Sequence, residues 1–267
     1  MLESGGLLLG VAVGVAAAWW ARRHSRSRRR RKLLQQPFPP AWEAMLRENL
    51  PLYRRLPEAL RRELHGHVQI FLDEKDFEGC GGLTITDEIR VTIAGQACML
   101  LLNRPTRHYH GLSAVLVYPK AYISNPETHE VRLGESWSNG TVVLSWSDVS
   151  RTAHDPKDGL NLVLHEFAHQ LDQEDGVGDG VPLLEQESRY ALWGQLMDKE
   201  YQRLVQLTRK GKKDVLQGYG ATNPAEFFAV ATEAFFEKPR QLHKKHPELY
   251  DELKAFYQLD PLTWKEN

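Results

Sequence analysis

Apolar residues recur every three or four positions along several stretches of this chain, and that spacing places them on one face of an α-helix. Five stretches predict helices at residues 41–48, 57–73, 87–102, 186–208 and 247–258. A sixth stretch has its apolar residues at the same spacing: Leu160, Leu164, Phe167 and Leu171. Asp155-Pro156 predicts the start of this sixth helix, with a capping carboxylate followed by a proline. Neighbouring apolar residues widen the stripe to almost every side, so we expect this helix to be buried.

Two further segments, residues 114–118 and 141–146, are rich in β-branched and aromatic residues and predict strands. Asn139-Gly140 is a strong hairpin signal that would join residues 131–138 to the second strand. We therefore expect residues 34–267 to form an α+β domain in which helices pack around a small sheet.

The buried sixth helix carries the pattern His165-Glu166-x-x-His169. Residues four apart lie above one another on a helix, so both imidazoles can reach one ion. Glu166 lies beside them and suits a carboxylate that takes a proton from water activated by a metal. A pair of hydrogen-bonded core histidines is the alternative, but three polar groups in an apolar helix need a stronger reason. The pattern predicts a zinc site.

Zinc needs a third protein ligand, and three candidates compete. Asp175 lies six residues past the second histidine, but the protease class with that spacing turns at a glycine where this chain has an aspartate. Glu226 and Glu233 share one face of another predicted helix, which begins at Asn223-Pro224. Glu226 could instead complete a capping box. Glu233 could instead accept a hydrogen bond from a histidine that binds the metal. Spacing alone does not separate these roles.

The chain resembles the Mlc titration factor A family of zinc-dependent metallopeptidases. The matching stretches are residues 143–146, 159–172, 180–182, 223–230 and 256–262. With weaker similarity upstream, the resemblance extends over about residues 38–263. It implies a zincin-like metallopeptidase domain.

The resemblance also implies roles for individual residues. His165, His169 and Glu226 would bind zinc, Glu166 would be the catalytic base, and Tyr219 would be a second catalytic group. A tyrosine hydroxyl can donate to a carbonyl oxygen that gains negative charge, although an aromatic residue here could equally well anchor a loop. The implied activity is aminopeptidase-like cleavage of short peptides. The alternative is a regulatory protein that sequesters a transcriptional repressor of sugar-uptake genes, with the zinc site secondary.

In zinc peptidases, a strand before the metal helix commonly pairs with the extended substrate. We therefore hypothesise that residues 141–146 bind the substrate backbone by strand addition.

The N-terminus has a different character from the rest of the chain. Residues 5–21 carry no charge and end in Trp19-Trp20, and residues 22–32 then contain eight basic residues. Positive charge after the apolar run predicts a single apolar span in the inner membrane, with the remaining domain on the cytoplasmic side. Residues 1–33 would then be an anchor followed by a basic segment close to the lipid.

The remaining chain is acidic. Without residues 22–32 and Glu3 it has 26 basic against 34 acidic residues, a net charge of about −8. That balance argues against direct nucleic-acid binding by the folded domain. Cys80 and Cys98 do not have the spacing of a metal site or a disulfide scaffold. The histidine pairs His65/His67 and His108/His110 are weak metal signals with no assigned role.

Overall fold

The computed structural model describes residues 24–105, 108–125, 130–137, 140–155 and 157–265. The chain divides into two compact units, residues 1–38 and 39–267. In the first unit, residues 24–35 are helical. The elements named below all belong to the second unit.

The structure contradicts the expected membrane-anchored location. No helix in the described part of the chain is long and apolar enough to cross a bilayer. The helix at residues 24–35 is strongly basic, and charged side chains are costly in hydrocarbon. The apolar segment at residues 5–21 lies outside the described residues.

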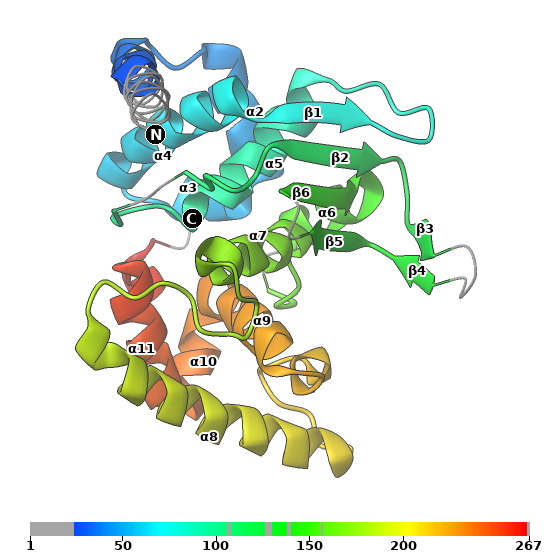
Figure 1. Ribbon diagram of the computed structural model, residues 1–267, viewed down its shortest axis with the longest axis vertical. Helices are drawn as coiled ribbons and strands as arrows, with labels where there is room; N and C mark the ends of the chain where they lie inside the picture. The colour runs from blue at the N-terminus through cyan, green and yellow to red at the C-terminus, as the bar shows by residue number, and fades with distance from the viewer. Residues whose placement is uncertain (1–23, 106–107, 126–129, 138–139, 156, 266–267) are drawn as a thin grey trace, which may run out of the picture. The chain divides into compact units, whose positions relative to one another are not determined.

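The second unit has the mixed α+β architecture expected from the sequence. Its main sheet has the strand order β1 (Asp76–Gly79), β2 (Ala114–Tyr118), β6 (Thr141–Ser145) and β5 (Gly134–Trp137). The first three strands are parallel, whereas β5 pairs antiparallel with β6 (Figure 1). A separate pair, β3 (Tyr122–Asn125) and β4 (Glu130–Arg132), forms a small antiparallel extension.

The inner strands owe their position to their apolar side chains. Val115 and Val117 of β2 are fully buried, as are Val142 and Leu144 of β6. Strands covered on both faces contain such continuous apolar runs. The predicted strand at residues 141–146 is confirmed to Ser145, and Trp146 begins a helix that the periodicity did not predict. The predicted hairpin agrees with the β5–β6 pairing, although residues 138–139 lie outside the described residues.

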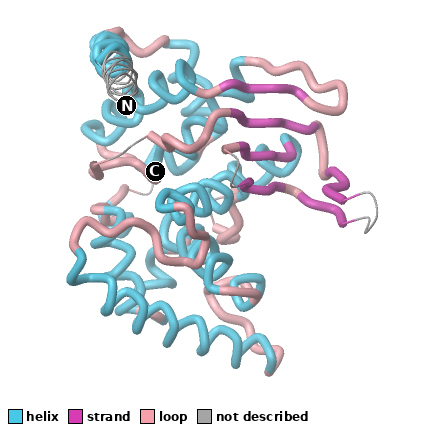
Figure 2. The backbone as a smooth tube through the Cα atoms, in the orientation of Figure 1, coloured by secondary structure: helices cyan, strands magenta, loops and turns pink. Residues whose placement is uncertain are grey.

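Helices make up most of the unit, as Figure 2 shows. The α-helices of the second unit are α2 (Pro40–Asn49), α3 (Pro51–Arg55), α4 (Glu58–Glu74), α5 (Asp87–Met99), α6 (Trp146–His154), α7 (Leu162–Asp172), α8 (Tyr190–Arg209), α9 (Pro224–Glu237), α10 (Pro239–Lys245) and α11 (Pro247–Tyr257). Short 3-10 turns are η1 (Gln173–Asp175), η2 (Glu187–Arg189), η3 (Gly218–Ala221) and η4 (Pro261–Thr263). The five helices predicted from periodicity are confirmed as α2, α4, α5, α8 and α11, with ends shifted by a few residues.

The start predicted for the histidine helix is wrong. Asp155 lies at the C-terminal end of α6, and Pro156 lies outside the described residues. Gly159 has a φ of +70°, which breaks the helical path, and Leu160 is exposed in the loop. The helix begins only after Asn161, whose Oδ1 accepts a hydrogen bond of 3.0 Å from Leu164 N.

Helix α7 occupies the centre of the unit. It contacts β5 and β6 on one side and α9 on the other, and these contacts hold it between the sheet and the C-terminal helices (Figure 1). Phe167 is fully buried and packs against Phe71 and Tyr109 at ring-centroid distances of 5.7 and 5.0 Å. The expectation of a buried helix is confirmed. A helix so tightly enclosed gives its polar residues fixed positions.

Candidate metal centre

Helix α7 presents its two histidines on one face. The imidazole centroids of His165 and His169 are 5.0 Å apart, and each side chain is only 12% exposed. Asn161 fixes the start of this helix and is itself held by α9, because its backbone N donates to Glu233 Oε2 at 2.5 Å. The orientation of the histidines therefore depends on two helices distant in sequence.

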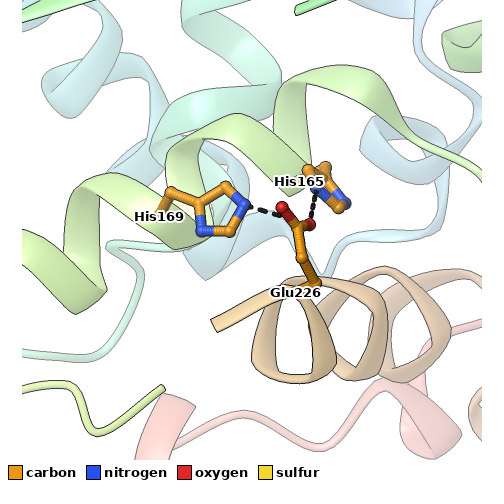
Figure 3. A group of neighbouring side chains, drawn as sticks. All are labelled: His165, His169 and Glu226. Carbon is orange, nitrogen blue, oxygen red and sulfur yellow. Dashed lines mark hydrogen bonds and ion pairs between the residues drawn. The ribbon is translucent and has the colours of Figure 1, made fainter. Parts of the chain in front are cut away.

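Glu226 reaches the same point from α9. Its carboxylate Oε2 lies 2.9 Å from His165 Nε2 and 3.4 Å from His169 Nε2 (Figure 3). Asn223 caps α9 by accepting a hydrogen bond from Glu226 N at 2.9 Å, while the Glu226 side chain turns to the histidines. Burial alone would raise the Glu226 pKa, but its hydrogen bonds to the two histidines hold it well below the usual range. Glu226 is therefore an ionised carboxylate.

The other two candidate ligands lie elsewhere. Glu233 Oε1 contacts His165 Nδ1 at 2.8 Å, on the side of the ring that faces away from Glu226. Asp175 is exposed in η1, and its Oδ1 accepts a hydrogen bond of 2.9 Å from Val177 N. Among the described residues, His165, His169 and Glu226 form the set whose potential ligand atoms all lie within 4.8 Å of one another.

This donor set fits a zinc ion. Two imidazole nitrogens and a carboxylate oxygen are the protein ligands of one common class of catalytic zinc site, with bonds of about 2.0–2.2 Å. The three atoms already converge on one region, so small side-chain movements would bring them into that range. Glu233 supplies the outer contact that commonly orients a ligand imidazole.

Glu166 lies beside the cluster and is only 6% exposed. Burial raises its pKa, while the nearby charges of His165 and His169 oppose the shift and leave a net increase. A carboxylate with a raised pKa is better suited to accept a proton near neutral pH. Gly134 of β5 lies directly against it, because a Cβ at that position would be 2.6 Å from Glu166 Oε1. A glycine is required for this approach.

Tyr219 completes the group of predicted site residues. It lies in η3, is 59% exposed, and donates a hydrogen bond of 3.3 Å to Glu226 Oε1. Partial burial of its hydroxyl and the charge of Glu226 raise its pKa to about 12, so the hydroxyl is neutral. The structure thus brings all five predicted residues to one place.

The cluster opens into a cleft formed by two adjoining cavities. They have volumes of about 520 and 550 Å³ and share six lining residues: Arg132, Gly134, His165, Glu166, Tyr219 and Glu226. Ion pairing of Arg132 with Glu135 at 2.7 Å places opposite charges next to each other on the β5 side. The cleft is therefore centred on the histidine–carboxylate cluster and bordered by β5.

The hypothesis that residues 141–146 bind the substrate backbone is wrong. Strand β6 lies between β2 and β5, so both of its edges are already paired. The edge strand beside the cleft is β5. The sequence did not predict that β5 borders the site. Gly134 and its neighbours form no recognisable motif, and their contact with Glu166 exists only in the folded chain.

Asp172, which replaces the turn glycine of another protease class, has its own structural role. It is fully buried, and both carboxylate oxygens lie 2.9 Å from the donating Gly180 N. Burial raises its pKa to about 6, although the hydrogen bond from Gly180 opposes this. The loop after α7 is fixed by this contact.

Of the weaker histidine signals, His67 and His108 meet at 3.2 Å between Nδ1 and Nε2. The other ring nitrogen of His67 faces Glu63. His65 Nε2 forms a hydrogen bond of 2.8 Å with the Tyr53 hydroxyl, which links α4 to α3.

Two histidines and a glutamate around one point, with a buried carboxylate on the histidine helix, define the metallopeptidase class of site. The chain belongs to the glucose-regulated metallo-peptidase M90 family, whose model matches residues 24–258. The family resemblance found in the sequence is thereby confirmed.

Three relatives show which proteins the chain is similar to over most of its length. An uncharacterized protein of Synechocystis sp. is 40% identical, and the alignment covers 96% of this chain and 97% of the relative. Mlc titration factor A of Pectobacterium atrosepticum is 30% identical, with 85% and 90% covered. Mlc titration factor A of Yersinia pestis is also 30% identical, with 80% and 83% covered.

Proposed function

We propose that this protein is a zinc-dependent peptidase that hydrolyses short peptides with aminopeptidase-like specificity. In this proposal His165, His169 and Glu226 hold the zinc ion, and residues 34–267 form the peptidase domain. The observation that carries it is the convergence of these three side chains within 4.8 Å, next to a buried Glu166 and in an open cleft. Membership of a metallopeptidase family supports it.

A bound zinc ion supplies Lewis acidity, which polarises a carbonyl group and makes water a better nucleophile at neutral pH. Glu166 takes a proton from the attacking water and later delivers it to the leaving amine. Its buried position keeps this carboxylate close to the ligand histidines and away from bulk solvent. Glu233 keeps the His165 ring oriented through its 2.8 Å contact with Nδ1.

Tyr219 acts on the carbonyl oxygen. That oxygen gains negative charge as water adds, and a neutral hydroxyl donor placed beside it lowers the barrier. The Tyr219 hydroxyl already lies 3.3 Å from Glu226 Oε1, at the border of both cavities. The raised pKa keeps its proton available for donation at neutral pH.

A second candidate function is the sequestration of a transcriptional repressor. The relatives at 30% identity are named Mlc titration factor A, and this name motivates the candidate. The acidic balance outside residues 22–32 is compatible with a protein partner rather than with direct DNA binding. Peptidase and repressor-binding functions can coexist in one chain.

The experiment that tests the peptidase proposal compares zinc content and hydrolysis of short peptides in the wild type and in Glu166→Gln. We expect the wild type to bind zinc and turn over peptide. The variant should keep zinc and lose at least about 100-fold in kcat, since general-base catalysis typically contributes 10²–10⁴-fold. Equal turnover in the two proteins would exclude the peptidase mechanism and leave repressor binding, which pull-down with purified repressor measures.

A further inference from the structure

The two halves of the cleft differ in chemistry. The half lined by Ser136, Gln173 and Asn223 also contains the carboxylates of Glu135 and Asp179. In the other half the lining includes four apolar side chains: Leu133, Leu160, Leu162 and Val230. A substrate that extends across the cluster therefore meets an acidic, polar environment on one side and an apolar one on the other.

The apolar half contains an unusual share of the exposed apolar side chains. Seven large hydrophobic residues are exposed among the described residues, and three of them, Leu133, Leu160 and Tyr219, line this cavity. Leu133 is 42% exposed and Leu160 is 38% exposed. Exposed apolar side chains that gather around a cavity mark a surface that becomes covered on binding. In the cleft of a peptidase, that covering group would be a side chain of the substrate.

Strand β5 shows how the substrate backbone is held. Ser145 N donates to Leu133 O at 2.8 Å, which places Leu133 in a hydrogen-bonded pair of the β5–β6 ladder. Such pairs alternate along an antiparallel ladder, so the backbone groups of Gly134 and Ser136 point away from β6. These groups lie on the free edge of β5, and Gly134 also contacts Glu166. An extended peptide can pair with this edge beside the base.

The charges indicate the direction of the peptide. Antiparallel pairing would place the amino-terminal side of the substrate next to Ser136, in the half where Asp179 can attract its ammonium group, whereas the charge of Glu135 is already paired with Arg132. Its carboxyl-terminal side would lie next to Leu133, in the half that Asp179 does not line. Parallel pairing would place the ammonium group in that half instead. Antiparallel pairing is also slightly more stable per residue.

We propose that a short peptide binds antiparallel to β5, with its free amino group in the acidic half and an apolar side chain after the scissile bond in the leucine-lined half. This inference rests on the proposed peptidase function and adds the substrate class. It assigns Leu133, Leu160, Leu162 and Val230 to the pocket that selects the residue on the leaving-amine side. A substrate with an acidic residue at that position would lose hydration against these four side chains, and Arg151, which lines the same cavity, is already paired with Asp148 at 3.1 Å.

The test compares peptides Ala-Leu-Ala-amide and Ala-Asp-Ala-amide, with the amino group free and the products identified by mass spectrometry. We expect cleavage after the first alanine and a kcat/KM at least about ten-fold higher for the leucine peptide, the discrimination typical of an apolar pocket. Leu160→Asp should reduce this ratio at least about ten-fold while keeping zinc. Leu192→Asp is the matched control, because Leu192 is a 56% exposed leucine on α8 outside the cleft.

Three results would overturn the inference. They are an unchanged ratio in Leu160→Asp, equal rates for the two peptides in the wild type, and an apolar preference at the residue before the scissile bond instead. If the wild type hydrolysed neither peptide, the proposed function would fail. Calorimetric affinities of the zinc-loaded Glu166→Gln variant would then decide the inference separately: tighter binding of the leucine peptide supports it, and equal affinities contradict it.

Discussion

Substitution of Gly134 by alanine is expected to damage catalysis more than metal binding or folding. The new Cβ would lie 2.6 Å from Glu166 Oε1, 2.8 Å from Leu162 Cδ1 and 2.9 Å from Glu166 Cγ. Ordinary contacts of a Cβ begin at 3.4 Å, so the carboxylate must move by about 0.8 Å. Misplacement of a catalytic group by about 1 Å can cost roughly 100-fold in rate. We therefore expect kcat to fall by about two orders of magnitude.

The assay measures kcat, KM and zinc content of Gly134→Ala on a peptide that the wild type cleaves. Overpacking of this kind costs about 1–3 kcal/mol of stability, so urea denaturation should show a folded protein with a reduced midpoint. Gly111→Ala is the control, because a Cβ there meets no atom within 4 Å. Wild-type kcat in Gly134→Ala would refute the close approach of β5 to the base as a catalytic requirement.

Three further outcomes follow from the contacts. Tyr219→Phe should retain zinc and KM but lose about 10²–10³-fold in kcat, the typical effect of removing one oxyanion donor; an unchanged kcat would exclude that role. Glu233→Gln should weaken zinc binding about 10–100-fold in a chelator competition, because the contact to His165 Nδ1 loses its charge; wild-type affinity would show that the outer contact is dispensable. His246 lies between Glu200 at 2.6 Å and Asp214 at 3.0 Å; burial lowers its pKa, but these two partners outweigh burial and raise it. The raised pKa stabilises the fold below the unfolded value of about 6.5, and this stabilisation is lost as pH rises through the folded value. Glu200 and Asp214 have lowered pKa values, so their contribution to stability has the opposite pH dependence. It is lost as pH falls through their pKa values in the folded protein. His246→Gln should therefore lower the urea midpoint more at pH 5.5 than at pH 8.5, and an equal loss at both would contradict this linkage.

Local sequence patterns predicted much of the helical framework because they record which side of an element is buried. The periodicity at residues 186–208 appears in the structure as α8, and its start differs because η2 occupies the first turn. Asn223-Pro224 correctly marked the start of α9. These features depend on neighbours within a few residues, so the linear sequence contains them.

The strand order and the outer parts of the site depend on contacts between distant segments. The hairpin signal at Asn139-Gly140 predicted the partner on one edge of residues 141–146, but nothing local shows that β2 pairs with the other edge. In the same way, spacing left Glu226, Glu233 and Asp175 as competing ligands. The packing of α9 on α7 distinguishes them, because it places Glu226 next to both histidines and Glu233 next to His165 Nδ1. The proximity of His165 and His169 could be predicted because residues four apart lie above one another on a helix.

The start of the histidine helix shows how a correct local signal can have another role. Asp155 resembles an N-cap, yet it ends α6 and accepts a hydrogen bond of 3.2 Å from Lys157 N. Asn161 is the true cap, and its position is fixed by Glu233 and by Glu237, whose Oε1 accepts from Asn161 Nδ2 at 3.0 Å. These partners lie more than 70 residues later in the chain, beyond the range of any capping rule.

The zinc stoichiometry of three purified proteins tests the metal centre most directly. Wild type, Glu226→Ala and Asp175→Ala would be incubated with zinc, desalted and analysed by inductively coupled plasma mass spectrometry. We predict about one zinc ion per chain in the wild type and in Asp175→Ala, and loss of most of the zinc in Glu226→Ala. Full zinc retention in Glu226→Ala, or its loss in Asp175→Ala, would contradict a centre formed by His165, His169 and Glu226.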